Sequence, residues 1–249
     1  MLKVDSFYDV LLSGMPEGLT VTEIVHGISW TAARLSSGGT GVAMHTQGET
    51  ASRRYNSLAG MDVKSAAEAI LSWNMEEASE GMAVINAFYN TQERVHECGG
   101  CKQTGAMGGI DITGKTVGFV GHLIGHSGIT KESLAPAKRY FVLEREPKPG
   151  DYPDSACEYL LPQCDVVVIT GSAAINKTLP RILELSKNAR TILTGPTVPL
   201  CERLLHLGID RLYGLAVTDG DGLCRSIIEG RGPINDFGER FLLDCNSER

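Results

Sequence analysis

The chain has 249 residues, of which 42% are hydrophobic and 21% are charged. This composition is that of a globular protein, and the length is enough for one large domain or two modest ones. The formal net charge of −7 argues against a nucleic-acid partner, because binding to phosphate backbones requires clustered Lys and Arg side chains.

The segment Met1–Asp9 lacks the basic start and the apolar stretch of an export signal. No segment approaches the roughly 20 apolar residues that a membrane-spanning helix needs. The seven cysteines are an odd number scattered along the chain, which suits a reducing compartment better than a disulfide framework. We therefore expect a cytoplasmic protein with no membrane contact, and the sequence leaves the number of subunits open, a homo-oligomer included.

Residues 1–97 are expected to form a small α+β domain. Val21–Leu35 is rich in β-forming residues, Ser36–Gly39 is a turn, and Thr40–His45 is a second strand, so a β-hairpin is predicted. Val63–Trp73 and Glu76–Tyr89 have apolar residues at three- and four-residue spacing, which predicts two helices.

The segment from Glu97 to Gly109 is too glycine-rich for regular structure, and we expect residues 98–115 to be a linker. The remaining part, 116–249, alternates short apolar runs with helix signals, which predicts an α/β domain with a doubly wound parallel sheet. The predicted strands are Thr116–Val120, Tyr140–Leu143, Asp165–Thr170, Thr191–Thr194 and Leu212–Val217.

The expected helix boundaries in this part have physical signals. Ser155 to Glu158 has capping-box spacing, Pro180 is expected to open a helix, and Gly208 and Gly230 are expected to end one.

In an open parallel sheet, ligands bind outside the carboxyl ends of the strands. Glycines there let the backbone approach a ligand, and hydroxyls and amides can bind anionic groups. Glu144 ends the second strand, where a ribose is often held. The glycines after the first strand lack the G-x-G-x-x-G spacing of dinucleotide sites. The residues that follow the strands are Gly121-His122, Glu144, Thr170-Gly171-Ser172 and Gly195-Pro196-Thr197.

Several motifs together resemble a family named for heavy-metal chelation, which is otherwise a domain of unknown function, and the resemblance covers nearly the whole chain. It implies an N-terminal domain like that of enolase, a Rossmann-like domain after it, and an active site between the two. The motifs are Glu49-Thr50, Ser72-Trp-Asn74, Glu77-Ala-Ser79, Ile85 to Asn90, Val117 to His122, Gly150 to Pro153, Leu161 to Asp165, Thr170-Gly171, Asn176 to Arg181 and Gly195 to Leu200.

The resemblance also implies which positions form the site and what it handles, a heavy metal or a metal-binding organic ligand. The implied site residues are Asn86, Gly121, His122, Thr170, Gly171, Asn176, Thr178, Gly195 and Pro196.

Two groups of residues are candidates for metal binding. His122 and His126 would share one helical face if a helix began soon after Val120, and His122 alone is the better candidate because it lies at the strand exit. His96, Cys98 and Cys101 could bind a soft ion such as zinc, although a single C-x-x-C lacks a second ligand pair.

Two further features have both a structural and a functional interpretation. Asn86 and Asn90 are four residues apart on a predicted helix and could reach the interdomain crevice, or they could belong to a polar outer face. The turn from Gly38 to Gly41 could lie over the ligand or serve hairpin geometry alone.

The leading hypothesis is a protein that binds a heavy or transition metal, or a metal-complexing small molecule, between the domains, and acts as a chelatase-like enzyme if it transfers the metal. In it His122 is a metal ligand or proton acceptor, Glu144 and Asn86 orient the organic partner, and the Thr170-Gly171 and Gly195 turns bind its anionic groups. One alternative is an enzyme that binds S-adenosylmethionine or another nucleoside through Glu144. The other is a non-catalytic metal carrier or sensor that uses His96, Cys98 and Cys101.

Overall fold

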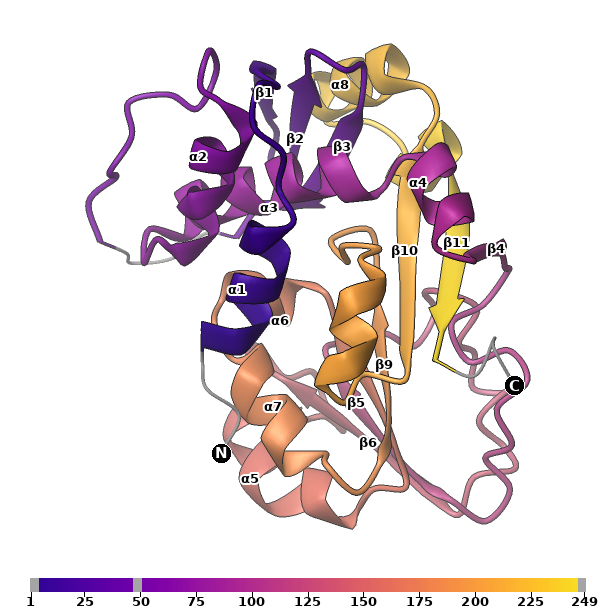
Figure 1. Cartoon of the computed structure of the whole chain (residues 1–249). Helices are drawn as coiled ribbons and strands as arrows, with labels where there is room; N and C mark the ends of the chain where they lie inside the picture. The colour runs from indigo at the N-terminus through magenta and orange to yellow at the C-terminus, as the bar shows by residue number, and fades with distance from the viewer. Residues whose placement is uncertain (1–4, 47–50, 246–249) are drawn as a thin grey trace.

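The structure is a computed structural model that describes residues 5–46 and 51–245 (Figure 1). The motif Glu49-Thr50 lies outside the described residues. The first part of the chain forms a three-stranded antiparallel sheet in the order β1-β2-β3. Its strands are β1 (Val21–His26), β2 (Trp30–Leu35) and β3 (Thr40–Met44).

The sequence predicted a hairpin of two strands here, whereas the structure has three strands. The run from Val21 to Leu35 is interrupted because Gly27 donates its amide to the Trp30 carbonyl in a tight turn. A Cβ at Gly27 would lie 2.5 Å from the Ile227 carbonyl oxygen, so only glycine fits where this turn meets a helix from the far end of the chain.

Helices precede and follow this small sheet along the chain. The two predicted helices are present, and the first of them ends in a 3-10 turn. Asp62, Asn74 and Thr91 cap the helices that follow them by accepting a backbone amide. The helices are α1 (Asp5–Ser13), α2 (Val63–Ala67), the 3-10 turn η1 (Glu68–Leu71), α3 (Met75–Tyr89) and α4 (Gln92–Glu97).

The second sheet has eight strands in the order β4-β11-β10-β9-β8-β5-β6-β7. The pairs from β7 to β10 are parallel, and β11 and β4 add an antiparallel edge. The five predicted strands are all present. The strands are β4 (Cys101–Lys102), β5 (Thr116–Val120), β6 (Arg139–Glu144), β7 (Tyr152–Pro153), β8 (Val166–Thr170), β9 (Arg190–Thr194), β10 (Arg211–Val217) and β11 (Gly238–Asp244).

Counted along the chain from β5, the parallel strands lie in the order third, second, first, fourth, fifth, sixth. This is the order of doubly wound sheets that bind nucleotides, in which the ligand crevice lies where the order reverses. Here that position is between β5 and β8, so Gly121-His122 and Thr170 are brought to the same edge.

The helical elements of this part are short. Pro180 lies in the first turn of its helix, and Gly208 and Gly230 end theirs in the left-handed conformation. The capping box predicted at Ser155 is wrong: Ala156 precedes the helix and no side chain caps it. The elements are η2 (Asp154–Ala156), α5 (Cys157–Leu160), η3 (Leu161–Gln163), α6 (Ser172–Ile175), α7 (Leu179–Leu185), η4 (Glu202–Leu207), α8 (Gly220–Glu229) and η5 (Ile234–Phe237).

The two faces of the large sheet are covered differently. Val167 and Ile169 of β8 belong to the largest buried cluster, together with residues of α6 and α7. Val166 and Val168 face the opposite way and pack with Ile112 and other residues of the turn-rich stretches at 106–112 and 123–134. No helix connects β5 to β6; a chain of turns does so.

The expected linker is also part of this packing. Cys101–Lys102 pairs with β11 as an edge strand, and Ala106 is fully buried. The glycine-rich stretch thus contains regular structure that composition did not predict.

Each of the two parts of the chain has a helix that packs against the other part (Figure 1). Helix α1 packs against η4, and its Tyr8 hydroxyl donates to the Ala174 carbonyl at 2.7 Å. Helix α8 packs in turn against β1 and β2. Within the described residues, no helix is long and apolar enough to cross a membrane.

Candidate functional site

A cavity of about 1130 Å³ lies at the carboxyl ends of β5, β6, β8 and β9. Residues that follow each of these strands line it, as the position of the strand-order reversal predicts. Trp30, Met44 and Thr46 of the N-terminal part complete its wall. The cavity is therefore built from both parts of the chain, and its size is that of a site for a small organic molecule.

The turn after β5 brings Gly121 and His122 to the cavity wall. Gly121 has a φ of 102°, a conformation that favours glycine. The Glu144 carboxylate fixes this turn, because one oxygen accepts the His122 amide at 2.9 Å and the other accepts the Arg145 amide at 2.8 Å. Glu144 lines the cavity too, but both of its oxygens already bind the backbone.

His122 forms a pair with a carboxylate. Its Nδ1 lies 3.1 Å from Asp151 Oδ2, and the Asp151 side chain is only 7% exposed whereas that of His122 is 33% exposed. Asp151 also accepts the Lys148 amide at 3.1 Å. A carboxylate on Nδ1 fixes the proton there and leaves Nε2 as the basic nitrogen.

The condition under which His122 and His126 would share a helical face is not met. Residues after Val120 form turns, with Gly125 at a φ of 94° and Ser127 at 53°. Both histidines nevertheless line the cavity.

At the end of β8, Thr170 lines the cavity and its hydroxyl lies 3.1 Å from that of Ser172. Gly171 is not a lining residue. A Cβ there would lie 2.9 Å from the Val198 amide nitrogen, so Gly171 allows two loops to pack closely beneath the cavity.

The segment after α6 contributes Asn176, Lys177 and Thr178 to the cavity wall. Asn176 accepts both the amide and the hydroxyl of Thr178, at 3.1 and 2.6 Å. Lys177 has a φ of 68°, which is unusual for a residue with a side chain. Burial lowers the pKa of its amine to about 8.

The turn after β9 brings Gly195 and Pro196 to the cavity. Gly195 has a φ of 117° and donates its amide to the Tyr213 carbonyl at 3.0 Å. The open space where its Cβ would stand leaves the backbone free to approach a ligand.

Asn86 and Asn90 point the same way from α3, but neither lines the cavity. The Asn86 amide donates to the carbonyls of Val42 and Thr197 at 2.8 and 3.0 Å, and it is fully buried. Asn90 donates to the Val198 carbonyl and accepts the Leu200 amide. Both side chains hold the loop after β9 against α3, so they support the cavity from behind.

The turn from Gly38 to Gly41 likewise lies away from the cavity. A Cβ at Gly39 or Gly41 would lie within 2.5 Å of the backbone of Ala87 in α3. These glycines therefore serve close packing of helix on strand.

The three candidate residues His96, Cys98 and Cys101 lie in different surroundings. The Cys98 thiol donates to a Glu202 carboxylate oxygen at 3.1 Å, and burial and that carboxylate raise its pKa to about 12. His96 packs edge-on against Phe241, and Cys101 is exposed on β4. Nowhere in residues 5–46 and 51–245 do three or more His, Cys, Asp or Glu side chains form a metal-binding group.

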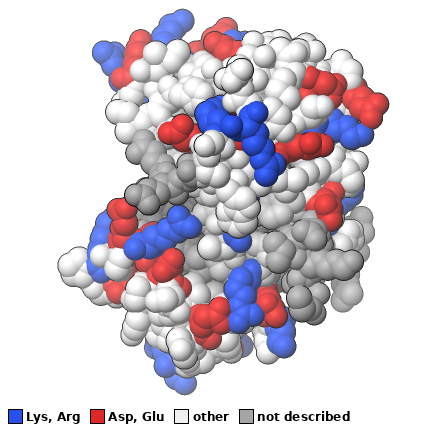
Figure 2. Space-filling view, turned by 90° about the vertical axis from the view of Figure 1, so that its left-hand side faces the viewer, with Lys and Arg blue, Asp and Glu red and all other residues white. Residues whose placement is uncertain are grey.

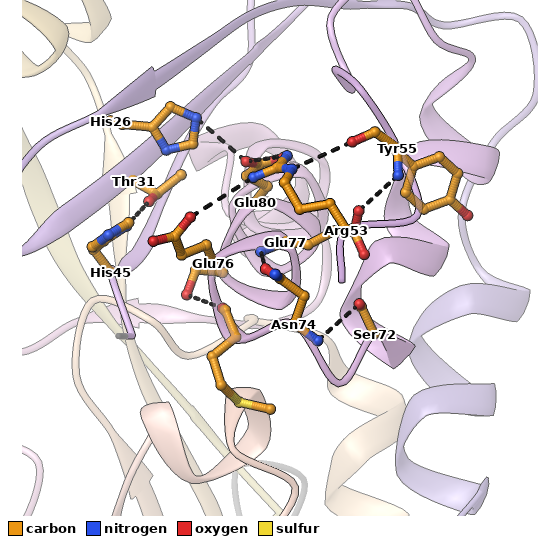
Figure 3. A network of polar contacts seen from close by, with 12 residues as sticks. His26, Thr31, His45, Arg53, Tyr55, Ser72, Asn74, Glu76, Glu77 and Glu80 are labelled. Carbon is orange, nitrogen blue, oxygen red and sulfur yellow. Dashed lines mark hydrogen bonds and ion pairs between the residues drawn. The ribbon is translucent and has the colours of Figure 1, made fainter. Parts of the chain in front are cut away.

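A polar network lies beside α3 in the N-terminal part (Figure 3). Arg53 donates to both Glu80 oxygens, at 2.7 and 2.8 Å, and His26 Nε2 lies 3.3 Å from the same carboxylate. Glu77 accepts the amides of Arg54 and Tyr55. The network fastens the segment 53–55 to α3.

Three cavity or near-cavity residues were not predicted as site residues. Asp151 lies in the motif from Gly150 to Pro153, and Lys177 follows Asn176, but nothing in their spacing indicates their roles. Arg240 lines the cavity from β11, a strand that the sequence did not reveal.

On the face drawn in Figure 2, basic and acidic residues are interspersed, with no continuous basic surface.

Comparison with known proteins gives relatives of the same architecture. A crystal structure of a protein of unknown function from Desulfitobacterium hafniense, assigned to the DUF364 family, is 34% identical, with a TM-score of 0.85 and coverage of 97% of this chain and 98% of that one. A DUF364-family protein of Pyrococcus horikoshii is 21% identical with a TM-score of 0.74, at coverages of 97% and 98%, and shows the fold alone.

An uncharacterized protein of Methanocaldococcus jannaschii is 31% identical over 155 residues, which are 60% of this chain and 58% of that protein. This chain thus matches somewhat more than half the length of that relative. Two family models match, DUF4213 over residues 8–89 and DUF364 over residues 110–240, and both carry the description "Putative heavy-metal chelation". The chain therefore belongs to the DUF364 family.

Proposed function

We propose that this protein binds a metal ion together with a small organic ligand in the cavity, and that His122 Nε2 is the metal ligand or proton acceptor. The observation that supports this most directly is the His122–Asp151 pair at the cavity wall. Metal-binding histidines commonly donate their other ring nitrogen to a carboxylate, which orients the ring and raises its basicity. The same arrangement suits a base that removes a proton from a ligand during metallation.

The number of metal-binding side chains decides whether the protein alone can hold a metal ion or needs an organic molecule to supply further ligands. Zinc sites in proteins have four protein ligands, or three with one position open to water or substrate, and the described residues contain no group of three. His122 therefore supplies one ligand, and the remaining positions would be filled by the organic molecule. The cavity of about 1130 Å³ has room for such a molecule.

The test is calorimetry of the untagged protein against Ni²⁺, Co²⁺, Cu²⁺ and Zn²⁺, each alone and with citrate. We expect His122→Ala to weaken binding of at least one ion at least tenfold, and Asp151→Asn to weaken it about 10- to 100-fold through loss of ring orientation. His206→Ala is the matched control, because His206 is exposed on η4. The proposal fails if wild type binds no ion in either form, or if His122→Ala binds as tightly as wild type.

A nucleoside or S-adenosylmethionine is the second candidate, and the strand order of the sheet favours it. Glu144 would then hold a ribose with the oxygen lone pairs that the two backbone amides leave free. Thermal-shift measurements with S-adenosylmethionine and adenosine should show stabilisation of wild type that Glu144→Gln reduces. No shift at millimolar ligand would remove this candidate and leave the metal proposal standing.

A further inference from the structure

Arg240 is a guanidinium at the cavity wall without a carboxylate partner among the side chains that the structure describes. Its Nη2 donates to the Asn235 side-chain oxygen, and its Cζ lies 5.6 Å from the Tyr213 ring centroid. Its Nη1 is buried and has no hydrogen-bond partner there. Burial lowers the pKa of Arg240, and Tyr213 rather than any Asp or Glu side chain opposes this effect.

Lys177 is a second such cation on the same cavity. Its Nζ donates to the Ile175 carbonyl at 2.6 Å and lies 5.9 Å from the Tyr8 ring centroid. Burial lowers its pKa, and the polar and ring contacts of the amine within the described residues are with a carbonyl and an aromatic ring, not with a carboxylate.

Another cavity cation shows what the ordinary arrangement looks like. Arg181 binds Glu158 at 2.8 Å and Glu184 at 2.7 Å, and it is half exposed. A cation that is more buried than Arg181 needs such a partner more, because an unpaired buried charge is costly. Lys177 and Arg240 are two exceptions on one cavity, which indicates that the ligand supplies the anionic groups that pair with them.

We propose that the organic ligand carries at least two anionic oxygen groups, carboxylates or phosphates, of which one binds Lys177 and the other binds Arg240. This inference rests on the proposed function, since it specifies the ligand that would accompany the metal. Such groups also suit that function chemically, because carboxylate and phosphate oxygens coordinate divalent ions.

Calorimetry at pH 7 without metal tests the inference with three probes: citrate, pyrophosphate and acetate. Wild type should bind citrate or pyrophosphate with a Kd of about 1 mM or lower and should not bind acetate measurably. Lys177→Met and Arg240→Met should each weaken that binding about tenfold or more, because each removes a charge-assisted contact. Arg181→Met is the matched control, since Glu158 and Glu184 already neutralise Arg181.

Lys177→Arg and Arg240→Lys keep the charge and should retain most of the affinity, which separates the loss of a contact from misfolding. Binding of citrate alone identifies carboxylates, and binding of pyrophosphate alone identifies phosphates. The inference is overturned if wild type binds neither probe, or if either Met variant binds as tightly as wild type. Metal binding by the Lys177→Met protein, lost on adding His122→Ala, would show that the proposed function survives that failure.

Discussion

Lys177 stands in a backbone conformation and an environment that both oppose a charged side chain. Its φ of 68° is one that glycine adopts freely and that costs other residues about 1 kcal/mol. Its amine is partly buried beside Tyr8, and its pKa falls from 10.5 to about 8. Such departures persist at functional sites, where the surrounding structure enforces them.

The lowered pKa of Lys177 predicts how stability depends on pH. Below pH 8 the amine is charged in both states, so the folded protein bears the full cost of its burial. Between about pH 8 and 10.5 the unfolded chain binds more protons, so the free energy of unfolding rises with pH. Allowing for partial exposure, we expect wild type to gain on the order of 1–2 kcal/mol relative to Lys177→Met across that window.

Urea denaturation of both proteins at pH 7, 8.5 and 10 measures this difference. The cysteine and tyrosine titrations are common to both proteins and cancel in the comparison. Lys187→Met removes an exposed charge just after α7 and should leave the pH dependence unchanged. A stability difference between wild type and Lys177→Met that stays constant from pH 7 to 10 would contradict the argument.

At the residue scale, the sequence identified cavity residues that lie where a strand ends. Gly121, His122, Thr170 and Gly195 all line the cavity, because strand exits in a parallel sheet converge on one edge. Arg240 escaped prediction because its position depends on an unpredicted strand. Asn86 was assigned to the ligand, whereas tertiary packing places its amide on backbone carbonyls.

At the element scale, the contact between α3 and β3 depends on a residue without a side chain. A Cβ at Gly41 would lie 2.0 Å from the Ala87 amide nitrogen and 2.3 Å from the Ala83 carbonyl oxygen. These are backbone atoms of a helix, so they cannot move aside as a flexible side chain does. Gly41→Ala must therefore separate the helix from the sheet.

We expect Gly41→Ala to lower the free energy of unfolding by about 2–4 kcal/mol, measured by urea denaturation. Gly105→Ala is the matched control, because the nearest atom to its Cβ would be 3.5 Å away, and its effect should stay below about 1 kcal/mol. Equal stabilities of the two variants would show that α3 can shift freely. The helix also carries Asn86, so Gly41→Ala should weaken ligand binding in the cavity as well.

The sequence pattern predicted the helix at Glu76–Tyr89 from its regular apolar spacing and the five central strands from their short, uninterrupted apolar runs. It missed β11 and the division of Val21–Leu35 into two strands. The division depends on Gly27 meeting Ile227, a contact between residues about two hundred positions apart. Periodicity within a window contains no information about such contacts.

At the scale of the whole molecule, the packing of α1 and α8, each against the other part, joins the two parts of the chain. Phe7 and Leu11 of α1 share one buried cluster with Leu204 of η4. Leu223 and Ile227 of α8 pack with Val25 of β1. Neither part can unfold without exposing apolar surface of the other. The packing of α1 and α8 therefore also fixes the position of the two parts that line the cavity.

This interlocking predicts a single cooperative unfolding transition. Both tryptophans, Trp30 and Trp73, lie in the N-terminal part, so fluorescence reports on that part while far-ultraviolet circular dichroism reports on the whole chain. Their urea midpoints should coincide, which is the usual test of two-state behaviour. Leu223→Ala should lower both midpoints together, by an amount equivalent to about 2–4 kcal/mol, although Leu223 belongs to the C-terminal part. Two separated midpoints, or a circular dichroism change without a fluorescence change, would mean that the parts unfold independently.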